Sequence, residues 1–187
     1  PLSPPRDDGS DAPRLPRETS FLRGWLRNPL RTGAVSPSSR QLALAMAEPV
    51  PAKAVASGAV VVELGPGTGV VTGCLLERGV PASQLVCLEY APEFCALVRE
   101  RFAGVHVIQG DAYRPPAALL DWIGARPLAA VVSSLPLMTR PEAERGAALT
   151  RWLDLLPPGA PFVQFSYSPS LPVRPERLRA VAEVSPW

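Results

Sequence analysis

Short, almost continuously apolar runs alternate with longer segments of helical period through most of this chain. Apolar runs of this kind are typical of parallel strands that are covered on both faces. The pattern predicts strands at residues 59–64, 84–90, 105–109, 128–133 and 161–167, and helices at 70–79, 92–102, 117–123 and 141–156. Because strand and helix alternate, we expect an α/β fold with a mostly parallel central sheet and helices on both faces.

The amino-terminal part of the chain has a different pattern. Residues 1–18 are rich in Pro, Asp, Arg and Ser and carry too little apolar surface to offset the entropy of ordering, which predicts a flexible leader. Residues 19–35 carry apolar side chains at helical spacing with arginines between them, which predicts a basic amphipathic helix. Residues 36–187 are expected to form the main domain, with a further helix beginning at Pro37.

Length and composition favour a single domain. The chain has 187 residues, and none of its apolar runs approaches the roughly 20 residues that cross a bilayer. The formal net charge of +2 hides an asymmetry, because residues 1–40 carry seven arginines against four acids. The three cysteines lack the spacing of a zinc site, so we expect buried thiols in a reducing cytoplasm. The single histidine, His106, lies within a predicted strand and is expected to be structural, so a metal centre and a Ser-His-Asp triad both lack parts.

A glycine-rich turn follows the first predicted strand, in the sequence Glu63-Leu64-Gly65-Pro66-Gly67-Thr68-Gly69. Glycines in such a turn let the backbone approach a ligand more closely than a Cβ would permit. The spacing lacks the third glycine of a dinucleotide fingerprint, and no GK[ST] is present for a nucleoside triphosphate. A tight strand-to-helix turn without a ligand has the same pattern, so the interpretation depends on the residues that accompany the loop.

Acidic residues lie at the carboxyl ends of the next two predicted strands. Glu89 lies 22 residues after Gly67, where a carboxylate can accept hydrogen bonds from both hydroxyls of a ribose. A solvated carboxylate at a strand end is the alternative. Asp111, within Gly110-Asp111-Ala112, is placed to accept from the exocyclic amine of an adenine. The carboxyl ends of parallel strands share one edge of the sheet, so the loop and both acids are expected to meet there.

These residues resemble the class I S-adenosylmethionine-dependent methyltransferases, a family with a Rossmann-like fold. The resemblance covers about residues 58–167, with ELGPGTG as the first motif, Glu89 as the ribose acid and Gly110-Asp111-Ala112 as the adenine motif. It implies S-adenosylmethionine as the cofactor and S-adenosylhomocysteine as the product. It also implies that Tyr90 packs on the adenine, and that the methionine end is held by Glu63, Gly65, Gly67, Thr68 and Gly69.

The methyl acceptor is expected at the end of the strand at 128–133, in the sequence Ser133-Ser134-Leu135-Pro136-Leu137. Amine methylation mainly needs an unprotonated nitrogen held in line with the methyl carbon. The Ser133 hydroxyl, which is also a candidate for the cofactor, and the Leu135 carbonyl can hold amine N–H groups in that orientation. A proline-ended strand without function is the alternative. The element resembles the NLPY or NPPY motif of enzymes that methylate adenine in nucleic acid, but departs from it twice. Ser133 or Ser134 replaces the asparagine, and Leu137 replaces the aromatic on which a flipped base stacks, which argues against a base.

The basic helix expected at 19–35 favours a lipid substrate instead. Apolar side chains on one face and arginines on the other suit the headgroup region of an anionic membrane. Packing on the domain edge and binding of nucleic-acid phosphates are the alternatives. With GAVSPSSR and SSLP, this helix makes the chain resemble the bacterial phospholipid N-methyltransferases from about Phe21 to Pro169. The resemblance implies that phosphatidylethanolamine and its methylated derivatives are methylated towards phosphatidylcholine.

The same resemblance adds further residues to the candidate site. It implies that Ser36 and Ser38 close over the cofactor. Arg40 is a candidate ligand of the lipid phosphate, because a guanidinium matches phosphate oxygens, with a solvated helix position as the alternative. Tyr167 is a candidate for orienting or deprotonating the amine, or else a core tyrosine with a satisfied hydroxyl.

We therefore expect a monomeric cytoplasmic enzyme that lies on the inner face of the bacterial membrane and binds neither metal nor nucleic acid. Two other hypotheses stay open. One is an adenine N6-methyltransferase that acts on ribosomal RNA, which needs an aromatic side chain donated from another loop. The other is a noncatalytic lipid-binding module that keeps the fold.

Overall fold

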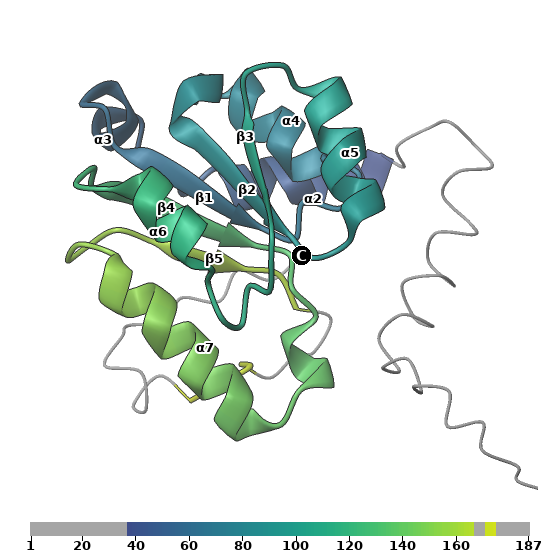
Figure 1. The fold of residues 1–187 in the computed structure, drawn as a ribbon, viewed down its shortest axis with the longest axis vertical. Coiled ribbons are helices and arrows are strands. Elements are labelled where there is room, and N and C mark those ends of the chain that lie inside the picture. Colours follow the sequence, from purple (N-terminus) through teal and green to yellow (C-terminus); the bar gives the residue numbers. More distant parts are fainter. Residues whose placement is uncertain (1–36, 167–170, 175–187) are drawn as a thin grey trace, which may run out of the picture. The chain divides into compact units, whose positions relative to one another are not determined.

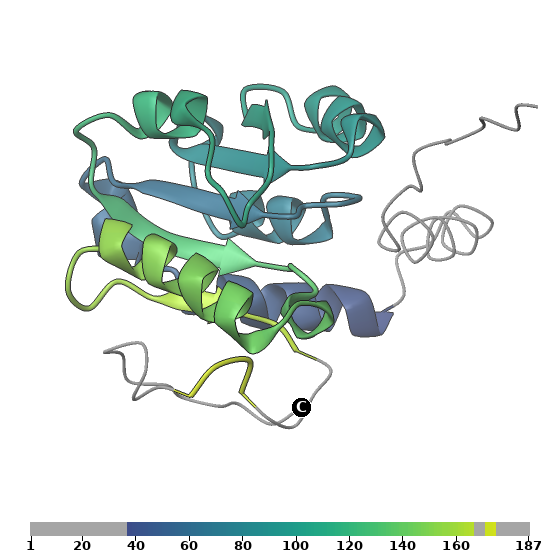
Figure 2. The same ribbon diagram turned by 60° about the horizontal axis from the view of Figure 1, so that its bottom comes forward.

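Parallel strands form a central sheet in the spatial order β3-β2-β1-β4-β5. The structure is a computed structural model that describes residues 37–166 and 171–174. Its strands are β1 (Val60–Leu64), β2 (Leu85–Glu89), β3 (His106–Gln109), β4 (Leu128–Ser133) and β5 (Phe162–Gln164). The arrowheads of the strands point the same way in Figure 2, so their carboxyl ends share one edge. The strand order reverses between β1 and β4, and ligands of such sheets bind outside the carboxyl ends at this point.

Helices cover both faces of the sheet. One face packs on α2 (Pro37–Ala47), α3 (Ala52–Ala56), α4 (Val70–Glu77) and α5 (Pro92–Arg101), and the other on α6 (Ala117–Ile123) and α7 (Glu142–Leu155). In Figure 1, α7 lies in front of the sheet and α2 behind it. Neighbouring residues of β1 alternate between the faces, with Val61 in the first core and Val60 and Val62 in the second. Burial on both faces explains why the strands are almost continuously apolar.

The expected fold class is confirmed, with small differences at the ends of elements. The helix from Pro37, the strand at 128–133 and the helix at 117–123 have the expected positions. The last described strand, β5, is shorter than expected, because it ends at Gln164. The sequence analysis missed α3 and two short 3-10 helices, η2 (Ala82–Gln84) and η3 (Leu137–Thr139). The leader at 1–18 and the helix at 19–35 lie outside the described residues.

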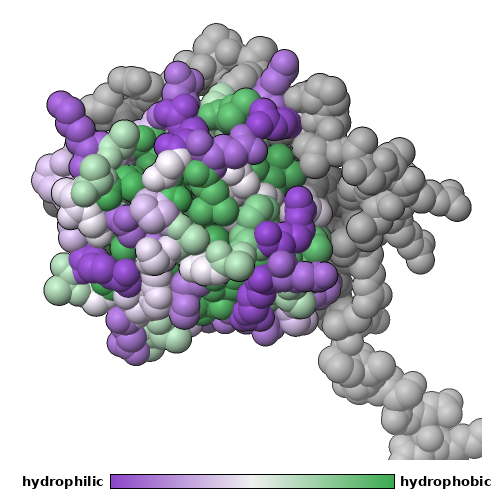
Figure 3. Space-filling model, turned by 90° about the horizontal axis from the view of Figure 1, so that it is seen from above, coloured by the Kyte–Doolittle hydropathy of each residue, from purple (hydrophilic) through white to green (hydrophobic). Residues whose placement is uncertain are grey.

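The three cysteines and the single histidine were expected to have structural roles. Cys74, Cys87 and Cys95 are buried free thiols. His106 begins the edge strand β3, is exposed, and stacks on Trp122 with 5.1 Å between the ring centroids. Burial lowers the pKa of His106, and the nearby arginines add to this effect. Seen from above the orientation of Figure 1, the surface mixes hydrophilic and hydrophobic residues (Figure 3).

The helices of the described part of the chain are too short or too polar to cross a bilayer. This finding concerns residues 37–166 and 171–174 alone.

Candidate cofactor and acceptor site

The glycine loop between β1 and α4 has a backbone that favours glycine. Gly65, Gly67 and Gly69 have φ values of 68°, 54° and 81°, in the left-handed region that other residues rarely adopt. A Cβ at Gly69 would lie 2.4 Å from Cε2 of Phe102, closer than carbon atoms pack. The backbone angles therefore explain all three glycines, and lack of space adds to this at Gly69. The loop leaves bare backbone at the carboxyl edge of the sheet.

Contacts from two other elements hold this loop in place. The Gly65 N–H donates to the Leu88 carbonyl at the end of β2, with 2.9 Å between nitrogen and oxygen. The guanidinium of Arg101, the last residue of α5, donates to the Thr68 carbonyl. The loop is thus tied to both β2 and α5, which positions it beside the residues that follow β2.

Glu89, at the end of β2, faces the glycine loop. Its side chain is buried, with 7% of the residue exposed. Oε2 accepts from the Gly67 N–H at 3.1 Å, and Oε1 accepts from the Ala91 N–H at 2.9 Å. A carboxylate oxygen can accept more than one hydrogen bond, so both oxygens can still accept from ribose hydroxyls. The neighbouring Tyr90 is 65% exposed and can pack on an adenine.

Glu63 lies one residue before the end of β1 and is fully buried. Its Oε2 accepts from the Thr72 hydroxyl at 2.7 Å and from the Cys87 thiol at 3.4 Å. Its other oxygen, Oε1, is buried and has no hydrogen-bond partner among the described residues. Desolvation is the largest cause that raises the pKa of Glu63 to about 7. An unsatisfied acceptor at the end of β1 fits a ligand with a donor group, bonded directly or through water.

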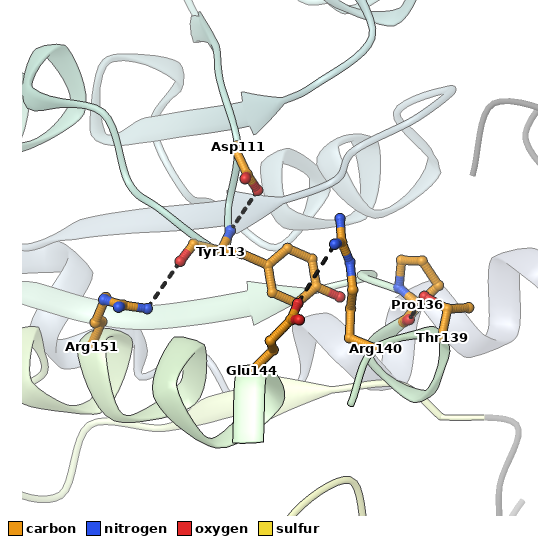
Figure 4. A network of polar contacts seen from close by, with 7 residues as sticks. All are labelled: Asp111, Tyr113, Pro136, Thr139, Arg140, Glu144 and Arg151. Carbon is orange, nitrogen blue, oxygen red and sulfur yellow. Dashed lines mark hydrogen bonds and ion pairs between the residues drawn. The ribbon is translucent and has the colours of Figure 1, made fainter. Parts of the chain in front are cut away.

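The loop after β3 places Asp111 at the same edge. Its Oδ1 accepts from the Tyr113 N–H at 2.9 Å, as Figure 4 shows. The Gly110 N–H donates to the Glu89 carbonyl at 2.9 Å, which joins this loop to β2. Ala112 is buried, and its carbonyl accepts from the Trp152 indole N–H at 2.9 Å. The structure therefore brings together the glycine loop, Glu89 and Asp111, and their arrangement fits an adenosyl group.

Replacing Gly110 by alanine is expected to destabilise this loop. A Cβ would lie 2.9 Å from Cγ of Pro116 and 3.1 Å from Cδ1 of Leu88, so both must shift. We expect a loss of about 1–3 kcal/mol in the free energy of unfolding, measured with urea. Gly73→Ala is the control, because its Cβ would meet Phe102 at an ordinary 3.6 Å and alanine favours the helix. Equal stability of the two variants would contradict the packing argument.

Residues 133–137 at the end of β4, the acceptor element, contain two serines that differ in exposure. Ser133 is fully buried, and its Oγ accepts from the Leu135 N–H at 3.4 Å. Ser134 is exposed, and its N–H donates to the Leu64 carbonyl at 2.9 Å, so it continues the pairing with β1. Ser134 therefore carries the exposed hydroxyl at this strand end, and Ser133 carries the buried one. The resemblance to the NLPY motif leaves open which of the two serines replaces the asparagine, and Ser133 is the residue predicted for the site.

Leu135 and Leu137 are the apolar residues of this element. The Leu135 carbonyl accepts from Nε2 of Gln164 at 2.9 Å and from the Leu137 N–H at 2.8 Å, so both of its lone pairs are used within the chain. Leu137 is 3% exposed and packs in a small core with Leu149 and Val173. The position that carries an aromatic in base-methylating enzymes is thus part of the interior here.

Gln164 and Tyr113 are functional candidates that the sequence analysis missed. Gln164 ends β5 beside Ser133 and holds the Leu135 carbonyl in place. Its Oε1 is buried, and no hydrogen-bond partner for it lies among the described residues. Tyr113 packs against the small core that contains Leu137. A glutamine in an apolar strand and an aromatic two residues after Asp111 were the available signals.

The remaining candidates are only partly described. Arg40 lies in α2 and forms an ion pair with Glu77, 2.6 Å between Nη2 and Oε2, and both side chains are about half exposed. Glu77 ends α4, about 10 Å along the helix from the glycine loop. The phosphate role of Arg40 stays a prediction. Ser36 and Tyr167 lie outside the described residues, and Ser38 belongs to α2 without a described side chain.

Within residues 37–166 and 171–174, the His, Cys, Asp and Glu side chains form no group of three or more that could hold a metal ion.

Comparisons with known proteins agree with this site. A family model described as "Methyltransferase domain" matches residues 61–159. The ornithine lipid N-methyltransferase of Singulisphaera acidiphila is 30% identical over 152 residues, which cover 80% of this chain and 77% of that protein. The ribosomal RNA small subunit methyltransferase A of a Synechococcus species is 44% identical over 59 residues, which cover 30% of this chain and 20% of that protein.

Solved structures show the same fold. The S-adenosylmethionine-bound amino pentose methyltransferase CalS10 from Micromonospora echinaspora is similar with a TM-score of 0.53 and 22% sequence identity. The match covers 83% of this chain and 58% of that one, so the chain spans little more than half the length of that structure.

Proposed function

Because the chain belongs to the class I S-adenosylmethionine-dependent methyltransferases, we propose that it methylates the headgroup amine of a membrane lipid at the membrane surface. The proposed acceptors are phosphatidylethanolamine and its methylated derivatives. S-adenosylmethionine is the cofactor, and it supplies a methyl group bonded to a positively charged sulfur. The relative that is an ornithine lipid N-methyltransferase supports an amine of a lipid as the acceptor class.

The observation that carries this proposal is the end of β4. Ser134 presents an exposed hydroxyl there, whereas Leu137 is buried at the position where a base would need an aromatic ring. A small aliphatic amine needs no stacking surface, only acceptors that orient its N–H groups. The exposed hydroxyl of Ser134 supplies such an acceptor.

The residues of the site act by positioning. The amine must be neutral, with its lone pair directed at the methyl carbon. Bound S-adenosylmethionine would supply the methyl group to this nitrogen, with the electrons of the broken carbon–sulfur bond left on sulfur. A primary or secondary amine would then lose a proton to water, whereas a tertiary amine would give a quaternary ammonium. Glu89 and Asp111 keep the adenosyl group in place, while the Ser134 hydroxyl orients the amine.

Transfer of labelled methyl groups to vesicles tests the proposal. The full chain is incubated with labelled S-adenosylmethionine and vesicles of phosphatidylethanolamine, with and without an anionic lipid, beside vesicles of ornithine lipid and a ribosomal RNA control. We expect labelled phosphatidylethanolamine, more label with anionic lipid, and a strong loss on Asp111→Ala. Labelled RNA with unlabelled lipid would favour the adenine methyltransferase, and cofactor binding without any turnover would favour the noncatalytic module.

Removing the exposed hydroxyl at the end of β4 tests the acceptor element. Ser134→Ala is expected to lower kcat/KM for the lipid amine about tenfold, because one hydrogen bond to the amine is lost. The affinity for S-adenosylmethionine should stay the same. Ser57→Ala is the control, because Ser57 is also exposed and its hydroxyl bonds only the Ala54 carbonyl near α3. An unchanged kcat/KM in Ser134→Ala would remove this hydroxyl from the acceptor site.

A further inference from the structure

Arginines gather around Tyr113, next to the acceptor element. The guanidinium carbon of Arg140 lies 5.0 Å from the centroid of the Tyr113 ring. Arg151 donates from Nη1 to the Tyr113 carbonyl at 3.2 Å, and Arg140 pairs with Glu144 at 3.6 Å. Figure 4 shows these side chains between the loop that carries Asp111 and the first turns of α7. The cluster therefore adjoins both the loop that carries Asp111 and the end of β4.

Arg145, the residue after Glu144 in α7, has an incomplete set of hydrogen-bond partners. Its Nη1 contacts the sulfur of Met138 at 3.3 Å, and a thioether is a weak acceptor. Its Nε is buried and has no hydrogen-bond partner within residues 37–166 and 171–174. Glu144, the adjacent carboxylate, is paired with Arg140 instead. A partly buried guanidinium without a strong acceptor is costly unless an anion completes it.

The chain between the acceptor element and Arg145 is tightly folded. The Leu137 N–H donates to the Leu135 carbonyl at 2.8 Å, and the Thr139 N–H donates to the Pro136 carbonyl at 3.0 Å. These turns keep Met138, and with it the Arg145 guanidinium, close to the element that presents Ser134. A group that binds Arg145 can thus be joined by a few bonds to an amine at the end of β4.

We propose that Arg145 binds the anionic group of the methyl acceptor. The ligand class is an oxyanion a few bonds from the reacting amine, because a guanidinium donates to two such oxygens at once. The phosphodiester of an ethanolamine headgroup and the carboxylate of an ornithine headgroup both fit this description. This inference rests on the proposed function, since it names how the same acceptor is recognised.

Kinetics with three acceptors test the oxyanion site in the full chain. Vesicles carry phosphatidylethanolamine, ornithine lipid, or a long-chain primary alkylamine that has no anionic group. Arg145→Gln is expected to raise KM about ten- to a hundredfold for the two anionic headgroups and to leave KM for the alkylamine within about twofold. Arg145→Lys should recover part of the affinity, because the charge returns without the planar fork. The relative size of the two losses separates phosphodiester from carboxylate recognition.

Arg78→Gln is the matched control, since it removes the same charge from an exposed side chain that donates to the Glu48 carbonyl. We expect its KM values to equal those of the unmodified chain. An equal rise of KM for all three acceptors in Arg145→Gln would overturn the proposal, and so would unchanged KM values.

Direct binding separates this inference from the proposed function. Calorimetry follows soluble glycerophosphoethanolamine added to the chain in the presence of S-adenosylhomocysteine. Saturable binding that is lost in Arg145→Gln and kept in Arg78→Gln supports the oxyanion site even where no lipid is methylated. Binding that is insensitive to Arg145→Gln, or no binding to the unmodified chain, overturns the oxyanion site even where lipid methylation is observed.

Discussion

Glu89→Ala is expected to weaken the binding of S-adenosylmethionine by more than about a hundredfold. The variant loses the carboxylate that is placed to accept from the ribose hydroxyls. It also leaves the N–H groups of Gly67 and Ala91 without their acceptor, so the glycine loop is no longer held towards β2. Both effects reduce affinity for the same ligand. Titration calorimetry with S-adenosylmethionine and S-adenosylhomocysteine measures the loss.

A second glutamate of the same segment provides the control for this result. Glu93 lies in the first turn of α5, is exposed, and carries the same charge as Glu89. Glu93→Gln should bind S-adenosylmethionine within about twofold of the unmodified chain, because exposed charges at this distance are screened. If Glu89→Ala binds as well as Glu93→Gln does, the ribose role of Glu89 is wrong.

Glu63→Gln is expected to change how stability depends on pH. Burial raises the pKa of Glu63 from 4.5 to about 7 in the folded chain, so the folded state keeps its proton where the unfolded state has lost it. Stability therefore falls as pH rises from about 4.5 to about 7, by up to about 3 kcal/mol, and stays lower above that range. The glutamine does not titrate, so the stability of the variant does not fall in this way. Relative to the unmodified chain, the variant therefore becomes more stable as pH rises.

Urea unfolding at pH 5 and pH 8 measures this difference. The free energy of unfolding of Glu63→Gln, relative to the unmodified chain, should be higher at pH 8 than at pH 5. Glu48→Gln is the control, because Glu48 is exposed and should leave the slope unchanged. Parallel profiles for Glu63→Gln and the unmodified chain would show that Glu63 does not titrate in this range.

The cofactor half of the site was predictable because its signals are local. Strands buried on both faces must be apolar throughout, and the tight turn after β1 demands glycine at Gly65 and Gly69. Glu89 ends β2 and Asp111 lies two residues after β3, so the parallel arrangement alone brings them to one edge. These features could be derived before the structure was known.

The acceptor half depends on register and on contacts between distant segments. Ser133 is the last residue of β4 and lies between Leu64 and Gln164 in the sheet, so it is inside and Ser134 is the first residue outside. An apolar run that ends in two serines does not show which of the two is the last residue of the strand. The environment of Arg145 could not be predicted either, because it depends on η3, a short helix without a periodic signal.

The strand order also affects which parts of the sheet can form first while the chain folds. β1, β2 and β3 are consecutive, so the cofactor half can form from neighbouring segments. β1 must also pair with β4, where Val61 is opposite Ala130, and this contact closes a far longer loop. On a ribosome the binding edge for the adenosyl group can thus assemble first. The surface that selects the acceptor is completed last, when β4, α7 and β5 have emerged.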